Sequence, residues 1–256
     1  MHGVVTTSLL PVRAEPKEQS ELVDQYLFGE PYRVLGEKGR WTRVESLIGG
    51  HPGWADSKLV VPLDHHVGEY LDNARFSASL IQTAGSPTGE IWLPAGSLIP
   101  FYANQMFYLN GKQYRFLGNF FDKGDIPTAV YELLNQFLGT VYLWGGKTLM
   151  GIDCSGLTQV IYRTVGIMLP RNSSQQATVG KEVPLEDSQV GDLAFFSKEP
   201  DSDRITHVGI ILRRGRIIHA SGTVHLSGLD NTGIFELDNP GQYTHYLKFV
   251  KRIIEI

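Results

Sequence analysis

The sequence predicts an α+β protein in which two small β domains precede a larger α+β domain. Between Val4 and Leu117 the apolar residues fall in short alternating stretches separated by turn residues, which is typical of small antiparallel β units. Helical spacing of apolar residues begins only after Asp125, and strand-like stretches return in the last third of the chain. A length of 256 residues suffices for two or three compact domains. We expect them at 1–64, 65–122 and 123–256.

Two stretches of the chain predict the small β domains. From Val4 to about Leu63, the segment LVDQYLF alternates, YRVLGEKGRWTRVES is broken at Lys38-Gly39, and HPGWADSKLV follows. From Phe76 to Leu117 the same pattern repeats, and Asn110-Gly111 in MFYLNGKQYRF marks a tight hairpin. Both stretches therefore predict small β-barrels.

The third domain is predicted to begin with an amphipathic helix after Asp125. Pro127 stands early in this helix, and Gly139 ends it. The apolar residues at helical spacing are Ala129, Val130, Leu133, Leu134, Phe137 and Leu138. A second helix is expected from Cys154 to Val165, after the glycine-rich LWGGKTLMGID. The stretches DLAFF, ITHVGIILRRGRIIHAS and YLKFVKRII then predict an antiparallel sheet.

Composition and charge exclude several classes of function. The chain is 42% hydrophobic and 20% charged with a net charge of −4, so we expect no nucleic-acid partner. No apolar run approaches the ~18 residues of a membrane helix, and the first residues lack a signal-peptide pattern. We therefore expect no membrane partner and a cytoplasmic location, unless a signal has been removed. A single cysteine excludes internal disulfides and a thiolate metal cluster.

Cys154, the single cysteine, stands where a reactive thiol is expected. Gly145, Gly146 and Gly151 bend the chain before it, and Asp153 precedes it as a helix cap. In the first helical turn, free N–H groups and the helix dipole stabilise a thiolate and lower the thiol pKa. The backbone N–H of Cys154 is also a natural oxyanion donor. The competing interpretation is a small buried apolar residue, which lone cysteines more often are.

Two histidines, His207 in ITHVGIIL and His219 in RIIHAS, stand 12 residues apart on adjacent predicted strands. If the register sum is even, they project from one face as opposite or diagonal neighbours. His207 is then the general base for the thiol, and His219 orients its imidazole. Each histidine alone is more often a satisfied polar residue, but together with Cys154 they favour catalysis. A metal site is not expected because the three residues lack short ligand spacing, and no cofactor is needed.

Several blocks of the sequence resemble the NlpC-type papain-like cell-wall cysteine peptidases. They are YLWGGKTLMGIDCSGLTQVIYR, LPRNSSQQ, VGDLAFF, THVGIIL and IIHAS, and they cover most of residues 140 to 221. The combination of DCSG, HVGI and the IIHAS histidine is a specific signal. The resemblance implies a papain-like α+β catalytic domain with an antiparallel sheet. It assigns Cys154 as the nucleophile, His207 as the base and His219 as the third polar member.

The N-terminal segments PVRAEPKEQSELVDQYLFGE and HPGWADSKL resemble the bacterial SH3-like domain of γ-D-glutamyl-L-diamino acid endopeptidases. This resemblance implies two SH3-like β-barrels before the catalytic domain. It also implies a murein peptide substrate, L-Ala-γ-D-Glu-L-diamino acid, cleaved between D-Glu and the diamino acid. In that subgroup the first SH3-like domain walls one end of the cleft, so that only peptides with a free N-terminal L-Ala fit.

The resemblance also implies which residues bind the substrate amine. Asp153 and an acidic residue of the first SH3-like domain are implied to hold the terminal ammonium, because an unpaired buried charge is costly. Asp153 also has the simpler interpretation of a helix cap, and the two roles are compatible. Glu15 and Glu21 are both candidates for the acidic partner. His51 stands where related enzymes often carry tyrosine, and its imidazole is a replacement donor.

Further contacts are implied around the D-Glu carboxylate. Ser155, Asn172 and Ser173 match family positions that donate to it. Arg171 either belongs to this group or is structural. Trp144 either lines the cleft or packs before the glycine turn.

The expected function is therefore a cysteine endopeptidase that hydrolyses the γ-D-Glu to L-diamino acid bond through a thioester, in cytoplasmic recycling of murein peptides. Three alternatives stay open. They are an exported wall hydrolase acting on intact stems, a non-catalytic wall-binding SH3-like module, and an amidase or acyl transferase on the same scaffold. The residues do not indicate the preferred diamino acid or the oligomeric state.

Overall fold

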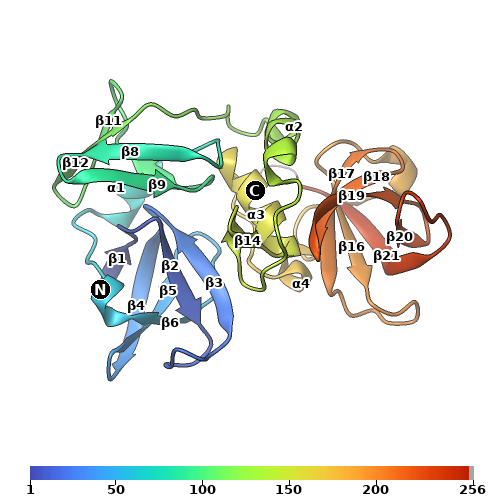
Figure 1. Cartoon of the computed structure of the whole chain (residues 1–256), viewed down its shortest axis with the longest axis horizontal. Coiled ribbons are helices and arrows are strands. Elements are labelled where there is room, and N and C mark those ends of the chain that lie inside the picture. Colours follow the sequence, from blue (N-terminus) through green and yellow to red (C-terminus); the bar gives the residue numbers. More distant parts are fainter. Residues whose placement is uncertain (254–256) are drawn as a thin grey trace.

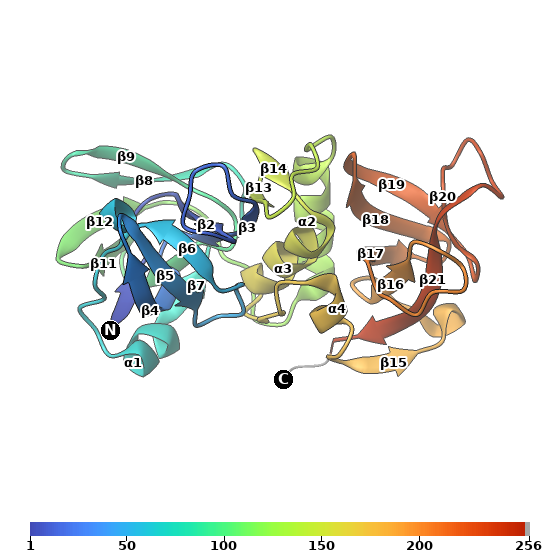
Figure 2. The ribbon, with the colours of Figure 1, turned by 90° about the horizontal axis from the view of Figure 1, so that it is seen from below.

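The computed structural model describes residues 1–253 and is elongated, with strand-rich ends on either side of a helical centre (Figure 1). Helices α2 (Ile126–Phe137) and α3 (Cys154–Thr164) form this centre, as the second view also shows (Figure 2). Within the described residues, no helix is both long and apolar enough to cross a membrane.

The first β region is one antiparallel sheet of six strands in the order β1-β4-β5-β6-β2-β3. Strands β4 and β5 form the hairpin predicted at Lys38-Gly39, where Gly39 has a φ of 60°. This confirms the predicted SH3-like β unit. The elements are β1 (His2–Val4), β2 (Leu9–Arg13), β3 (Leu22–Leu27), β4 (Pro31–Lys38), β5 (Trp41–Ser46), β6 (Gly53–Asp56) and the 3-10 helix η1 (Ser57–Leu59).

The second β region divides its strands between a four-stranded sheet, β11-β12-β8-β9, and a two-stranded sheet, β10-β7. The predicted hairpin is confirmed, because Asn110 and Gly111 both have positive φ and Leu109 pairs with Lys112. The elements are α1 (Val67–Asp72), β7 (Ala74–Phe76), β8 (Gln82–Ser86), β9 (Gly89–Leu93), β10 (Leu98–Pro100), β11 (Met106–Leu109) and β12 (Lys112–Phe116).

Helix α2 has the ends that the sequence predicts. The side chain of Asp125 accepts a hydrogen bond from the N–H of Thr128 at 3.2 Å, and Gly139 follows the last turn with a φ of 81°. Its predicted apolar face is buried, except that Leu138 lies past the end of the helix and is exposed. The buried face packs against α3, and both helices belong to one hydrophobic core.

Helix α3 is buried along its whole length. On one side Gln159 Nε2 donates to the carbonyl of Gly49 at 3.0 Å, and Arg163 lies 2.6 Å from Glu30 of the first β region. The opposite side packs against β17 (His207–Arg213) of the C-terminal sheet. Helix α3 therefore lies between the first β region and the C-terminal sheet.

The C-terminal sheet has seven antiparallel strands in the order β15-β21-β16-β17-β18-β19-β20. Strand β20 also pairs with β21, so strands β16 to β21 close into a barrel. The prediction contains β16, β17, β18 and β21 but lacks β15, β19 and β20. The remaining elements are β13 (Lys147–Thr148), β14 (Gly151–Ile152), α4 (Ser173–Gln176), β15 (Lys181–Val183), η2 (Leu185–Asp187), β16 (Leu193–Ser197), β18 (Arg216–Ser221), β19 (Thr223–Leu229), β20 (Gly233–Phe235) and β21 (Tyr243–Arg252).

Candidate active site

Cys154 is the first residue of α3, as the sequence predicts. The carboxylate of Asp153 caps the helix by accepting the N–H of Gly156 at 2.7 Å. In the described chain, the backbone N–H of Cys154 has no hydrogen-bond partner, which leaves it free to receive an oxyanion. The side chain is 7% exposed and forms part of the wall of a cleft.

The thiol of Cys154 is not acidic in this resting state. Burial first, and the nearby charge of Asp153 second, raise its pKa to about 12. The N–H groups of Val208 and Ser155 act in the opposite direction but do not compensate. The prediction of a lowered thiol pKa is therefore wrong, because desolvation outweighs the helix start. A neutral thiol needs a base that removes its proton.

His207 and His219 form a hydrogen-bonded pair on one face of the sheet. Ile210 pairs with Ile218 and Ile211 with Ile217, so the register sum is even and the two histidines are diagonal neighbours. His207 Nε2 lies 2.8 Å from His219 Nδ1. The predicted juxtaposition of the two histidines is confirmed.

His207 begins strand β17, which packs against α3, but its ring makes no hydrogen bond to Cys154 in the part of the chain that the structure describes. Val208, the residue after His207, has its backbone N–H close enough to the Cys154 sulfur to affect the pKa of the thiol. Among the described residues, Cys154 Sγ makes no hydrogen bond to either histidine, and His207 Nδ1 has no partner. Because Nε2 of His207 is occupied by His219, Nδ1 is the nitrogen left for the thiol proton. Resting enzymes often show such loose catalytic contacts.

Further residues of the barrel enclose this histidine pair. His245 of β21 stacks on His207 with ring centroids 4.1 Å apart, and His225 of β19 pairs with His219. Burial lowers the pKa of His207 well below its usual value, that of His219 to about 3 and that of His245 to about 4. All three imidazoles are therefore neutral at pH 7. Over residues 1–253 no group of three or more histidine, cysteine or acidic side chains has an arrangement that suits a metal ion.

The cleft beside Cys154 has a volume of about 690 Å³ and runs from the first β region to the segment before β17. Its lining residues come from five segments of the chain. They are Val23, Tyr142, Trp144, Asp153, Cys154, Ser155, Arg171, Asn172, Ser173, Ser174, Asp203, Arg204, Ile205 and Thr206. Of the residues implied for substrate binding, Asp153, Ser155, Asn172, Ser173 and Trp144 thus reach this cleft. Glu21 touches it through Trp144.

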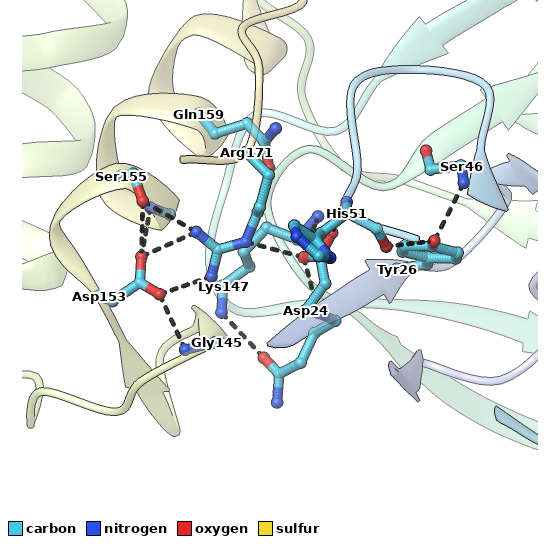
Figure 3. A network of polar contacts seen from close by, with 12 residues as sticks. Asp24, Tyr26, Ser46, His51, Gly145, Lys147, Asp153, Ser155, Gln159 and Arg171 are labelled. Atoms are coloured by element: carbon cyan, nitrogen blue, oxygen red, sulfur yellow. Dashed lines mark hydrogen bonds and ion pairs between the residues drawn. The ribbon is translucent and has the colours of Figure 1, made fainter. Parts of the chain in front are cut away.

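Asp153 belongs to a buried ion-pair network (Figure 3). Arg171 Nη1 and Nη2 lie 2.9 and 2.6 Å from the two oxygens of Asp153, while Arg171 Nε lies 2.9 Å from Asp24 Oδ1. Lys147 Nζ lies 3.0 Å from the same oxygen of Asp24. Burial alone raises the pKa of Asp24, but Lys147 and Arg171 lower it below the ordinary value. Arg171 is therefore structural, which resolves the alternative that the sequence left open.

The network leaves Asp153 little capacity for a substrate ammonium. Besides Arg171, its oxygens accept hydrogen bonds from Ser155 Oγ at 3.2 Å and from the N–H of Gly145 at 2.8 Å. Ser155 Oγ in turn accepts from Arg171 at 3.0 Å, so its hydroxyl is engaged as well. Both residues border the cleft, but their polar atoms are already paired.

Glu21, which directly precedes β3 of the first β region, contacts Trp144 of the cleft lining. Trp144 is 60% exposed and its Nε1 donates to Glu21 Oε1 at 2.5 Å. This favours the cleft-lining interpretation of Trp144. Glu15, the alternative acidic residue, pairs with Lys17 on an exposed surface. His51 does not line the cleft: its N–H donates to Asp24, and its Nδ1 bonds to the carbonyl of Pro52.

Several residues of the site are absent from the prediction. Tyr142 borders the cleft, and burial followed by the charges of Cys154 and Asp153 raises its pKa above the usual value. Tyr142 belongs to the YLWGG block of the sequence, where its aromatic ring could have indicated a cleft residue. Asp24 and Lys147 carried no signal, because only tertiary contact brings them to Arg171. Asn172 and Ser173 were predicted, and Asn172 also precedes α4 and donates its N–H to Gln175 at 3.4 Å.

A nucleophile at the start of a buried helix, beside a hydrogen-bonded histidine pair on an antiparallel sheet, defines a papain-like cysteine peptidase. Comparisons with known proteins agree. Residues 139–249 match the NlpC/P60 family and residues 12–58 match the bacterial dipeptidyl-peptidase SH3 domain. The chain belongs to the NlpC/P60 family.

Curated relatives support this membership, and a solved structure has the same fold. A γ-D-glutamyl-L-lysine dipeptidyl-peptidase of Bacillus subtilis is 31% identical over 216 residues, covering 78% of this chain and 72% of the relative. One of Bacillus cereus with the same description is 30% identical, covering 85% and 73%. The crystal structure of an NlpC/P60 family protein from Bacillus cereus superposes with a TM-score of 0.80 at 21% identity, covering 98% of this chain and 99% of that one.

Proposed function

We propose that this cysteine peptidase hydrolyses the bond between γ-D-Glu and an L-diamino acid in murein peptides that have a free N-terminal L-Ala. The observation that carries the proposal is the placement of Glu21, from the first β region, against Trp144 at one end of the Cys154 cleft. The names of the two Bacillus relatives agree with a γ-D-glutamyl substrate.

A cleft that is closed at one end measures its substrate from that end. An N-terminal ammonium at this wall needs a carboxylate, and Glu21 has one oxygen that is not bonded to Trp144. Asp153 is a weaker candidate than the sequence implied, because Arg171 and the helix cap already occupy its oxygens. We therefore assign Glu21 as the main partner of the amine and Asp153 as a contributor to the local negative charge.

The D-Glu carboxylate is proposed to lie near Asn172 and Ser173, which border the cleft beside Cys154. Ser155 contributes less than its position suggests, because its hydroxyl bonds to Asp153 and Arg171. Arg171 still adds positive charge behind this wall, which favours an anion.

In the proposed reaction the thiol proton of Cys154 passes to Nδ1 of His207, and the sulfur attacks the γ-carbonyl carbon. The resulting oxyanion accepts a hydrogen bond from the backbone N–H of Cys154. His207 then gives its proton to the leaving amine, so that the C–N bond breaks and a thioester remains. A water molecule gives a proton to His207 and attacks the thioester, which releases the γ-carboxylate and restores the thiol.

The departing diamino acid is proposed to lie toward Asp203 and Arg204, which line the cleft from the segment before β17. Neither side chain has an ion-pair partner among the described residues. The side chain of meso-diaminopimelate ends in an ammonium and a carboxylate, whereas lysine ends in an ammonium alone. An acidic and a basic residue that both line the cleft match the former, so we propose diaminopimelate as the preferred residue.

The proposed setting is the recycling of murein peptides in the cytoplasm. The support is chemical: a requirement for a free L-Ala amine excludes stems that are still attached to glycan through that amine. The alternative is an exported enzyme that cuts intact stems. Digestion of purified sacculi separates the two, because release of fragments from sacculi with blocked amines contradicts the recycling proposal.

The substrate is tested by incubating the protein with L-Ala-γ-D-Glu-meso-diaminopimelate and with its N-acetylated form. Mass spectrometry should detect L-Ala-γ-D-Glu and free diaminopimelate from the first peptide and little product from the second. Equal cleavage of both would contradict recognition of the amine. Cleavage of another bond would point to an amidase or an acyl transferase.

A further inference from the structure

Ser227 lies behind the two catalytic histidines, on strand β19. Its side chain is fully buried, and its Oγ lies 3.1 Å from His219 Nε2. With the 2.8 Å contact between His219 Nδ1 and His207 Nε2, this makes a continuous chain of hydrogen bonds, Ser227–His219–His207. The free end of the chain is Nδ1 of His207, and the backbone N–H of the following residue, Val208, points to the Cys154 sulfur.

Each neutral histidine in this chain carries one ring proton, so only two arrangements are consistent. In the first, His207 Nε2–H donates to His219 Nδ1, and His219 Nε2–H donates to the oxygen of Ser227. In the second, the serine hydroxyl donates to His219 Nε2, His219 Nδ1–H donates to His207 Nε2, and the remaining proton of His207 sits on Nδ1.

The two arrangements differ in whether His207 is a base. In the first, Nδ1 of His207 has a lone pair that receives the thiol proton. In the second, Nδ1 already bears a hydrogen and no proton can be taken from Cys154. Whether the Ser227 hydroxyl accepts or donates the hydrogen bond to His219 therefore decides whether His207 can act as a base.

We propose that Ser227 is a positioning residue of the active site: by accepting a hydrogen bond from His219 Nε2–H, it selects the tautomer of His207 that takes the proton from Cys154. This inference rests on the proposed cysteine-peptidase chemistry.

The surroundings leave the histidines few other ways to fix their tautomers. His245 stacks on the His207 ring at an interplanar angle of 25°, and His225 packs against His219 with centroids 4.5 Å apart. His225 has its own tautomer fixed by the carbonyl of Thr223, an acceptor 2.9 Å from Nδ1. His219 has no carbonyl at either nitrogen among its described contacts, so the Ser227 hydroxyl is the contact at Nε2 that can bias its tautomer. Burial lowers the pKa of both His207 and His219, so a competing protonated state is suppressed near pH 7.

The direct test is a long-range ¹H–¹⁵N NMR spectrum of the histidine rings of the wild-type protein without substrate at pH 7. We expect a pyrrole-like Nε2 and a pyridine-like Nδ1 for both His207 and His219, assigned with single histidine variants. A pyrrole-like Nδ1 on His219 would overturn the inference. This measurement requires no variant of Ser227 to fold.

A substitution series tests the consequence for turnover. Ser227→Ala leaves the buried Nε2–H without an acceptor, and we expect kcat to fall about tenfold with KM unchanged, together with loss of the single tautomer. Ser227→Thr keeps the hydroxyl and should keep kcat within about threefold. The matched control is Ser197→Ala, because Ser197 is equally buried in the same barrel and donates to the carbonyl of Glu199 instead. Full activity and an unchanged spectrum in Ser227→Ala would also overturn the inference.

The outcomes separate this inference from the substrate proposal. If the NMR tautomers are as expected but the murein tripeptide is not cleaved, the substrate assignment fails and the role of Ser227 stands. If the tripeptide is cleaved and the tautomers are reversed, the role of Ser227 fails alone.

Discussion

Replacing Glu21 by glutamine removes one negative charge from the end wall of the cleft while keeping an oxygen for the indole N–H. Trp144 donates to Glu21 Oε1 at 2.5 Å in the wild type, and a glutamine side chain preserves this contact. The variant therefore changes the charge that faces the substrate amine without releasing the tryptophan.

The expected size of the effect follows from the exposure of Glu21. A hydrogen bond to a charged group contributes about 1.5–3 kcal/mol, and solvent screening reduces this at an exposed carboxylate to about 1 kcal/mol. We therefore expect kcat/KM for L-Ala-γ-D-Glu-meso-diaminopimelate to fall roughly fivefold.

The assay compares the free and the N-acetylated tripeptide with wild type and variant. The N-acetylated peptide has no ammonium, so Glu21→Gln should change its slow hydrolysis by less than about twofold. Glu15→Gln is the matched control, because Glu15 is also acidic and exposed but pairs with Lys17 away from the cleft. An equal loss on both peptides, or a loss in the control as large as in Glu21→Gln, would refute recognition of the amine by Glu21.

Four further results are expected. Cys154→Ala should abolish hydrolysis while the thermal unfolding midpoint is kept within about 5 °C, measured by mass spectrometry and circular dichroism. Because burial lowers the pKa of His207, kcat should stay near its maximum as the pH falls below 6.5, and an acid limb centred at or above 6.5 would contradict this. Burial lowers the pKa of His219 from 6.5 to about 3, so the unfolded chain binds more protons in this range; the free energy of unfolding should fall by up to about 1.4 kcal/mol per pH unit as the pH drops from 6.5 toward 3, less steeply in His219→Gln, measured by urea unfolding. Arg204→Ala should lower kcat/KM roughly fivefold for the diaminopimelate peptide but not for its lysine analogue, and an equal loss on both would contradict the assignment of the diamino acid.

Local sequence signals were sufficient to predict the elements that carry the nucleophile and the base. Asp153 before Cys154 is a helix cap by residue type alone, and the structure has α3 beginning at Cys154. Because His207 and His219 are 12 residues apart, the sequence left open only whether the numbers of paired residues on the two strands have an even sum. The pairing of Ile210 with Ile218 shows that they do. Periodicity and turn chemistry act over a few residues. The start of α3 and the shared face of the two histidines depend on contacts of that length, so the sequence could predict them.

The rest of the site depends on contacts that have no local signature. The acidity of the thiol was predicted from the helix start alone, whereas burial under β17 reverses the sign of the shift. The closure of the barrel depends on the pairing of Gly233 with Tyr246, which no periodicity in either strand indicates. Ser227 belongs to β19, a strand absent from the prediction, and its role emerges only when β18 and β19 are aligned.

The same long-range contacts make the first β region part of the active site. Three buried acids meet three buried bases around α3: Asp24, Glu30 and Asp153 face Lys147, Arg163 and Arg171. Two of the acids come from the first β region, and all three bases come from the third. Loss of the Asp24 or Glu30 carboxylate alone would leave Lys147 or Arg163 buried without its ion-pair partner, which costs several kcal/mol for each. The Arg171 that loses Asp24 is the residue that holds Asp153, and Asp153 caps the helix that begins with the nucleophile. The SH3-like region therefore supplies buried ion-pair partners that support the helix of the proposed catalytic site. A role limited to tethering the enzyme to the wall does not account for these contacts.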